Sequence, residues 1–245
     1  MTTSRLCRAP FALFALLCVT AFVTAAVGVA EAHDGLVPAI EQVGGAAPRP
    51  QPWQVSLGVR SALFKGAGYD PFSTNDVFAQ GAVTATRAFR TGARLATAVG
   101  VLWESGNQDA TARGAASSLS LSRLGAVLEE RVEPRPWLTA FARLSPSWLR
   151  GKASLMDPTI AAPLRTSFST FGVDASVGAA LLLGPRAGRV GFWLVGDAGY
   201  GWAPDQHLAL RPDLPAADRD KAGVTTLSDL APRGIFYRLA LALTF

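Results

Sequence analysis

One pattern constrains this sequence most: between Trp53 and Phe245, apolar side chains recur at every second position in a series of separate runs. The stretch WQVSLGVR places every second residue from Trp53 to Val59 on one apolar face, with polar or small residues between them. A period of two is that of a β-strand between an apolar and a polar environment. We expect eight such strands, near residues 53–63, 77–89, 93–104, 118–132, 137–149, 167–183, 190–202 and 234–245.

The connections between these runs alternate between short and long. Three are short and rich in turn-forming residues: 90–92 (RTG), 133–136 (EPRP) and 184–189 (GPRAGR). Four are long: 64–76, 105–117, 150–166 and 203–233. Short turns at one end and long loops at the other predict an all-β, eight-stranded antiparallel up-and-down transmembrane barrel. The alternative count is ten, because the segments HLALRP and AGVTTL of the last long loop could form two further strands.

A soluble barrel would also alternate, so the composition of the two faces decides between the two classes. In the run 190–202 the bulky residues Phe192, Leu194 and Tyr200 share one face, and Asp197 lies on the other with three glycines, a tryptophan and a valine. A soluble barrel would bury the bulky face and expose the charge, whereas a membrane barrel turns the bulky face to lipid. The charged residues of these runs therefore favour the membrane barrel.

Aromatic residues collect at both expected ends of the strands. Those near the short turns are Trp53, Phe89, Phe192 and Phe245. Those toward the long loops are Trp103, Trp148, Tyr200, Trp202 and Tyr237. Such rings concentrate at the two water interfaces of membrane barrels, so two girdles are expected.

The run 118–132 does not follow one register. Leu119 and Leu121 alternate on one face, but Leu124 and Leu128 lie on the other. Either a β-bulge lies near Ser122 or the strand is misplaced.

The first residues read as an export signal rather than as part of the barrel. Arg5 and Arg8 precede an apolar stretch that ends in Ala30-Glu31-Ala32, a small-x-small cleavage pattern. We therefore expect a signal peptide at 1–32, a periplasmic spacer at 33–52 and the barrel at 53–245. The alternative is an uncleaved anchor, since the apolar run approaches the ~20 residues that span a bilayer. Both cysteines lie within the signal, so the mature chain has no disulfide.

The last strand carries the most specific pattern in the chain. Its apolar residues alternate up to the final aromatic residue: Tyr237, Leu239, Leu241, Leu243 and Phe245. This pattern resembles the C-terminal strand signature of bacterial outer-membrane proteins, which the barrel-assembly machinery reads during insertion. The region from about 50 to 245 is similar to the small eight-stranded family that includes OmpA-type and OmpW-type barrels. The peptidoglycan-binding domain usual in OmpA-type proteins is not expected here. The last strand is expected to pair with the one that begins at Trp53, so that no edge is left in the bilayer.

No constellation of catalytic residues stands out. His207 is followed by Ala209 where lipid A deacylases, which are similar in architecture, have the serine of a His-x-Ser pair. Asp205 and His207 form only a weak protease-like pair, and His33 lies at the expected new N-terminus. No metal site, cofactor site or phosphate-binding loop is expected. The chain is basic, with a net charge of +5, but its cations are too dispersed to indicate nucleic acid.

Charged residues on the expected lumen face are the remaining candidates for function. Most lie about six to nine residues from the short turns, which places them in one mid-barrel layer. They are Arg60, Glu104, Arg143, Asp174, Asp197 and Arg238. Unpaired charges in a confined interior are costly, so Asp197 is expected to pair with Arg238 and, beyond it, with Arg60. An eight-stranded barrel is just wide enough for side chains to fill, and such a layer would close the lumen.

The sequence thus predicts a non-enzymatic, monomeric barrel of the bacterial outer membrane with a structural or surface-interaction role. Its expected partners are outer-membrane lipid, lipopolysaccharide and, during insertion, the barrel-assembly machinery. Two alternatives stay open: a narrow channel for small or apolar solutes, in which the charged layer is a gate, and a lipid-modifying enzyme that uses His207.

Overall fold

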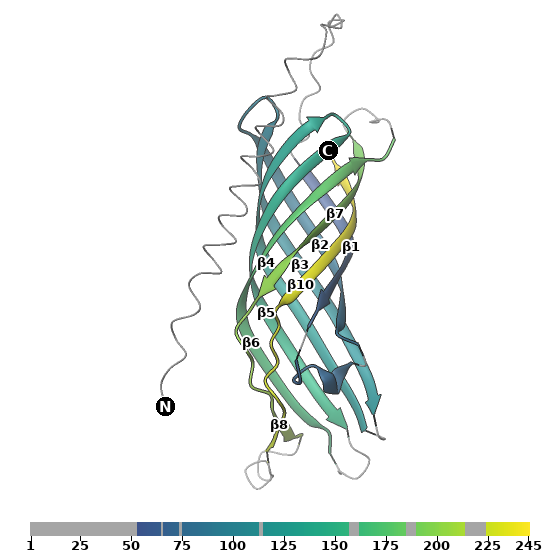
Figure 1. The fold of residues 1–245 in the computed structure, drawn as a ribbon, viewed down its shortest axis with the longest axis vertical. Helices are drawn as coiled ribbons and strands as arrows, with labels where there is room; N and C mark the ends of the chain where they lie inside the picture. The colour runs from purple at the N-terminus through teal and green to yellow at the C-terminus, as the bar shows by residue number, and fades with distance from the viewer. Residues whose placement is uncertain are drawn as a thin grey trace, which may run out of the picture.

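The computed structural model describes residues 53–245, except 65, 74, 113–114, 157–161, 185–189 and 214–223. The expected signal peptide and spacer, residues 1–52, lie outside the described residues. Eight long strands dominate the structure (Figure 1). They are β1 (Trp53–Leu63), β2 (Val77–Arg90), β3 (Leu95–Ala112), β4 (Ala115–Arg135), β5 (Leu138–Met156), β6 (Leu164–Leu182), β7 (Gly191–Trp202) and β10 (Gly234–Thr244). In the described parts of the chain, no helix is both long and apolar enough to cross a membrane.

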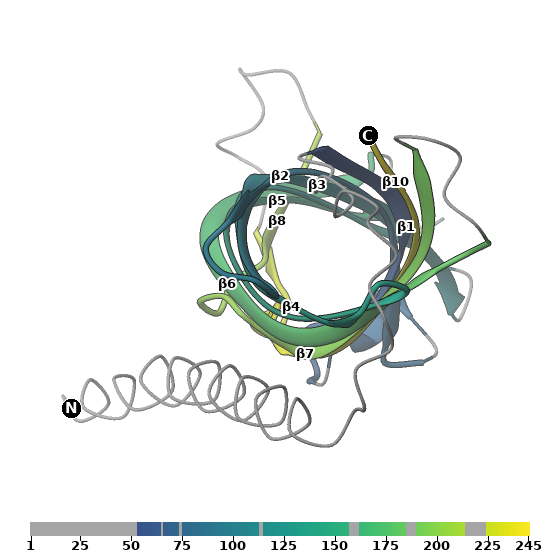
Figure 2. The same cartoon turned by 90° about the horizontal axis from the view of Figure 1, so that it is seen from above.

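The eight long strands form a closed antiparallel ring (Figure 2). Each strand from β1 to β7 pairs with the next, and β10 pairs with both β7 and β1. At the seam, the Trp53 amide donates to the Phe245 carbonyl at 3.3 Å, and the Phe245 amide donates to the Trp53 carbonyl at 3.1 Å. The expected closure by the last strand is confirmed, and it leaves the ring without an edge.

The long loop after β7 contains the two extra strands of the ten-strand alternative. They are β8 (Ala209–Pro212) and β9 (Thr225–Thr226). Strand β8 pairs with the end of β6, where Arg165 faces Arg211, and β9 pairs only with β8. Because β7 pairs directly with β10 along its length, the ring has no place for them. The ten-strand count is therefore wrong for the barrel itself, and the fold is an eight-stranded transmembrane β-barrel.

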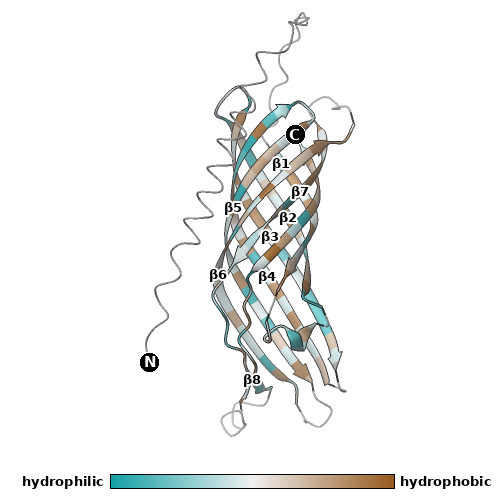
Figure 3. Ribbon diagram, in the orientation of Figure 1, coloured by the Kyte–Doolittle hydropathy of each residue, from teal (hydrophilic) through white to brown (hydrophobic). Residues whose placement is uncertain are grey.

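The outer surface of the ring is apolar. Leu57, Leu239 and Leu241 are 68%, 61% and 61% exposed, and the outward faces of neighbouring strands are similar. The outward aromatic residues at the short-turn end are Trp53, Phe89, Phe192 and Phe245, and those toward the long loops include Trp103, Trp148, Tyr200 and Tyr237. Figure 3 shows the alternation of apolar and polar residues along the strands. So much exposed apolar surface on a closed ring is that of a barrel in lipid.

Strands β3 to β6 extend far beyond the rest of the ring at the long-loop end (Figure 1). The segments 105–117 and 150–166 were expected to be loops, but most of their described residues continue the strands. Pairing runs without a break up to Ala112–Ala115 between β3 and β4, and up to Leu155–Leu164 between β5 and β6. The expectation of loops was wrong because these segments are polar on their outer face, which is compatible with a strand in water.

Of the two alternatives for the run 118–132, the bulge near Ser122 is absent from this described part of β4. The register between β3 and β4 is unbroken from Leu95–Val132 to Ala112–Ala115. The irregularity between β4 and β5 lies near the short turn, between Val132 and Arg135. The apolar residues change from the outward to the inward face of the strand because the surroundings of the outer face change from lipid to water. Leu124 and Leu128 point outward, whereas Leu119 and Leu121 point inward and are buried.

The outer face changes character between two adjacent rows of residues on β3 to β6. The apolar row, in which each residue is the register partner of the next, is Trp103, Leu124, Trp148 and Phe171. The next row toward the long loops is Ser105, Ser122, Arg150 and Ser169. The lipid-facing surface therefore ends at the apolar row, and the wall beyond it faces water.

Candidate functional site

The middle of the barrel interior is filled by charged side chains. We call this set the lumen network: Arg60, Glu104, Arg123, Glu129, Arg131, Arg143, Asp174, Asp197 and Arg238. All but Arg131 are at most 6% exposed. Period-two alternation from seven strands brings these side chains to one layer, and β2 adds Gln80, which accepts a hydrogen bond from Arg60 at 2.8 Å. Every strand of the ring therefore contributes to one connected interior network.

Ion pairs link the upper part of the network around two carboxylates. Asp174 accepts hydrogen bonds from Arg123 and, at 3.3 Å, from Nη2 of Arg60. Glu104 accepts a hydrogen bond from Nη2 of Arg238 at 2.7 Å and lies 3.7 Å from Nε of Arg60. Glu104 also lies 3.8 Å from Nε of Arg123. It therefore stands between guanidinium groups of β4 and β10, which lie across the barrel from each other.

The lower part of the network continues toward the short turns. Nη1 of Arg238 donates to Asp197 at 2.9 Å, and Nη1 of Arg143 lies 3.4 Å from the same carboxylate. Arg143 donates through Nε to Glu129 at 2.7 Å, and Arg131 contacts the other oxygen of Glu129 at 2.6 Å. Such buried pairs are stable only when the partners stay together, because removal of one leaves an uncompensated charge.

The register explains which expected pair forms. Arg238 is the register partner of both Asp197 and Arg60, so it stands between them. Its pair with Asp197 is present, but the expected contact of Asp197 with Arg60 is not found in the described structure. Arg60 turns instead to Asp174 and Glu104. Adjacent guanidinium groups would repel, and the ring of Phe236 lies against both, 4.4 Å from Arg60 and 5.2 Å from Arg238.

Sequence reasoning missed three members of the network, all on β4. Arg123, Glu129 and Arg131 share the inward register with Leu119 and Leu121. Because the leucines of this run fall on both faces, the register of the charged residues stayed undecided. All three lie at odd positions, as Leu119 and Leu121 do. A single uninterrupted alternation along the strand would therefore have placed all five side chains on the same face.

Beyond the lumen network, the long-loop end is filled by apolar side chains that we call the loop-end cluster. Its residues are Ala62, Phe64, Tyr69, Phe72, Phe78, Leu119, Leu121, Ala153, Leu164, Leu208, Leu210, Leu230 and Phe236. The short 3-10 helix η1 (Asp70–Phe72) of the first loop supplies Phe72, which is fully buried. The ring of Phe64 stacks on Phe78 with a centroid distance of 5.7 Å and meets Tyr69 edge-on at 5.6 Å. Two loops far apart in sequence thus close this end of the barrel with a dry core.

Tyr69 shows how tightly this cluster is packed. The residue is 2% exposed, and its hydroxyl donates to the carbonyl of Val77 at 3.0 Å. Burial raises the pKa of the Tyr69 hydroxyl above its ordinary value of 10.0, and the nearby Asp76 carboxylate adds to the rise.

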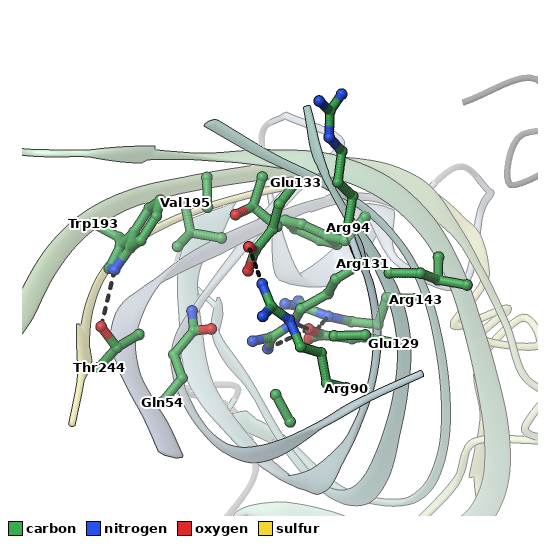
Figure 4. A pocket seen from close by; sticks show the side chains of 16 residues that line it. Gln54, Arg90, Arg94, Glu129, Arg131, Glu133, Arg143, Trp193, Val195 and Thr244 are labelled. Atoms are coloured by element: carbon green, nitrogen blue, oxygen red, sulfur yellow. Dashed lines mark hydrogen bonds and ion pairs between the residues drawn. The ribbon is translucent and has the colours of Figure 1, made fainter. Parts of the chain in front are cut away.

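At the short-turn end, a cavity of about 70 Å³ opens below the network (Figure 4). Glu129, Arg131 and Arg143 form its floor, and Arg90 and Glu133 face each other across it at 3.9 Å. On its wall, the indole Nε1 of Trp193 donates to the hydroxyl of Thr244 at 3.1 Å. The cavity is large enough and polar enough to hold ordered water, and it ends at the lumen network.

The candidate catalytic histidine does not belong to either interior layer. Nδ1 of His207 lies 2.8 Å from Asp229, and both side chains are exposed on the last long loop. Asp205, the partner weighed from the sequence, instead contacts Arg233 at 3.5 Å. His33 lies outside the described residues. Among the described residues, no three His, Cys, Asp or Glu side chains gather where they could hold a metal ion.

The residues of the expected insertion signal lie on the outer face of β10. Tyr237, Leu239 and Leu241 are 57%, 61% and 61% exposed, and Phe245 is 48% exposed at the seam. Their inward neighbours on the strand, among them Arg238 and Ala240, are buried. Successive residues of β10 therefore face the lipid and the lumen in turn.

Comparison with known proteins gives likeness only at the level of structure. No protein-family model matches the chain, and no curated protein matches it in sequence. The chain is similar to several solved structures, among them three from different bacteria. Ail, the attachment invasion locus protein of Yersinia pestis, is 12% identical, covers 80% of this chain and 100% of its own, and has a TM-score of 0.44. A major outer membrane protein from Thermus thermophilus is 15% identical, covers 79% and 99%, and has a TM-score of 0.48. Neisserial surface protein A is 12% identical, covers 82% and 99%, and has a TM-score of 0.44.

Proposed function

We propose that this protein is an integral barrel of the bacterial outer membrane with a structural or surface-interaction role, and that its lumen does not conduct. The observation that carries this proposal is the double closure of the interior. The lumen network draws on all eight strands, and the loop-end cluster fills the space beyond it. A path for a solute would have to cross both layers.

The proposed location and partners follow from the apolar outer surface of the barrel and from the expected signal peptide. The apolar outer surface requires a bilayer, and the signal peptide proposed at 1–32 would direct the chain across the inner membrane. The spacer at 33–52 would then lie in the periplasm. Assignment to the OmpA-type and OmpW-type group is also a proposal, supported by the alternation from Tyr237 to Phe245. The barrel-assembly machinery would read this strand, and lipopolysaccharide would surround a monomeric barrel on the outer side.

Conductance in planar bilayers tests the closed lumen. We expect no steady conductance from the wild-type protein, and none from Arg238→Ala, because the loop-end cluster remains in place in the variant. A steady wild-type conductance that Arg238→Ala abolishes or enlarges would instead support a gated channel. Heat-modifiable gel mobility in the outer-membrane fraction is the control for folding and location. A soluble protein without such a shift would contradict the proposed location.

A further inference from the structure

A groove of about 610 Å³ lies on the outer surface of the wall beyond the apolar row. We call it the outer groove; the residues that matter to it are Ser118, Ser120, Lys152, Ser154, Arg165 and Arg211. The register joins four of them into one row, since Ser118 pairs with Ser154, Ser154 with Arg165 and Arg165 with Arg211. The groove thus spans β4, β5, β6 and the short strand β8.

The charges around this groove are unbalanced. Lys152, Arg211 and the nearby Arg150 are exposed, and none of the three contacts a carboxylate in the part of the chain that the structure describes. Arg165 contacts Asp213 at 2.7 Å, and Asp109 on β3 accepts a hydrogen bond from Asn107 at 2.9 Å. Three cations therefore remain without a counter-charge from the described protein.

The strand pairing makes this imbalance worse. Arg165 and Arg211 are register partners, and like charges directly opposite each other on a sheet are destabilising. Asp213 relieves only Arg165. An anionic ligand between Arg211 and Lys152 would remove the repulsion that remains.

The size and polarity of the groove suit a phosphorylated sugar. Pockets for small molecules measure roughly 300–1,000 Å³, so the groove is larger than a single ion requires. The serine hydroxyls on its wall can donate to or accept from sugar hydroxyls, and the cations can form charge-assisted hydrogen bonds with phosphate oxygens.

The position of the groove indicates that this sugar belongs to a lipid. Arg150 and Lys152 follow Trp148 by two and four residues on the same face of β5. At ~2.3 Å of height per residue in a strand tilted near 45°, they lie about 5 and 9 Å above the apolar row. The headgroup layer of a bilayer is ~5–8 Å thick on each side, so Arg150 falls within it and Lys152 lies just above its outer edge.

We propose that the outer groove binds the phosphorylated saccharide headgroup of an outer-leaflet lipid whose acyl chains lie against Leu124, Trp148 and Phe171. This assignment rests on the proposed membrane location. Lipid binding would be the function of the part of β4 to β6 that extends beyond the apolar row.

Binding of lipid A to the folded, detergent-solubilised full chain tests the proposal. We expect diphosphoryl lipid A to bind about tenfold more weakly to the double variant Lys152→Ser/Arg211→Ser than to the wild type. Dephosphorylated lipid A should bind both proteins equally weakly. The matched control is Arg135→Ser, which removes an exposed arginine at the opposite end of the barrel and should leave binding unchanged. Native mass spectrometry can count the bound lipids.

Three results would overturn the assignment. Equal binding of phosphorylated and dephosphorylated lipid would reduce the contact to acyl chains alone. Unchanged binding by the double variant would place the lipid elsewhere on the barrel. Equal affinity for soluble glucosamine 1-phosphate would indicate a soluble ligand instead of a lipid. Gel mobility separates these outcomes from failure of the proposed function, since an unfolded or soluble wild-type protein would fail before any lipid is added.

Discussion

Strand β4 passes through two environments, and its two halves have opposite polarity. From Leu124 to Glu129, the outward side chains include exposed leucines, and the inward ones include the buried carboxylate of Glu129. From Ser117 to Ser122, the outward positions are serines, and the inward Leu119 and Leu121 are at most 1% exposed. The backbone register does not change between the halves.

The two halves show that the alternation has one cause, and that the choice of face for the apolar residues has another. The period of two comes from the pleat, so it persists along the whole strand. Which face of the strand is apolar depends on which side of the sheet meets water. In the membrane half, lipid lies outside and the polar groups must find partners inside. In the outer half, water lies outside and the interior becomes a dry core like that of a soluble barrel.

The largest expected effect comes from removing the carboxylate at the centre of the membrane half. Glu104→Gln leaves Arg60, Arg123 and Arg238 with one fewer counter-charge in an interior where the Glu104 side chain is fully buried. We expect a loss of about 3–5 kcal/mol in the free energy of unfolding, because the remaining charges are uncompensated. Urea unfolding in lipid vesicles, followed by gel mobility, measures it. The control Glu133→Gln, at a side chain that is 41% exposed, should cost at most about 1 kcal/mol. Equal losses in the two variants would indicate a water-filled lumen.

The second prediction compares the outer faces of the two halves directly. Leu128→Arg puts a charge on the lipid-facing surface, where the expected cost is about 2–4 kcal/mol if the position is near the bilayer midplane. Ser118→Arg puts the same charge on the same face of β4 beyond the apolar row, where it meets water opposite Asp109 and Ser154 and should change stability by about 0.5 kcal/mol or less. The same unfolding assay applies to both. Similar costs at both positions would contradict the boundary at the row of Trp103, Leu124, Trp148 and Phe171.

The smallest expected effect is a pH dependence confined to the loop-end cluster. The raised pKa of Tyr69 means that the folded state holds the phenol proton more tightly than the unfolded state does. This contribution to stability is therefore fully present below pH 10 and is lost as the pH rises through the higher folded-state pKa. Tyrosinate absorbance and unfolding measured from pH 9 upward should show the loss in the wild type. Tyr69→Phe should remove this slope, at a cost of about 1 kcal/mol for the lost hydrogen bond to Val77. An identical slope in the variant would assign the dependence to another group.

Most of the ring could be predicted from the sequence because its signal is local. The bounds of β1 and the closure of the ring by the last strand follow from alternation and from the final run of leucines. The pair of Asp197 with Arg238 was also within reach, since adjacent strands with known directions place the two at a similar height. The lengths of β3 to β6 were not, because a strand with water on its outer face carries the polar composition of a loop.

What the sequence alone determined is the period of two, the number of strands in the ring and the membrane face of most strands. These properties depend on side chains within one strand or on its immediate neighbour. Only the tertiary structure decided that Arg60 turns to Asp174 and Glu104, that two distant loops close the barrel with one apolar cluster, and that Arg211 comes to lie beside Arg165. Those contacts join residues far apart in the chain, so they depend on the shear and closure of the whole ring, which no local pattern encodes.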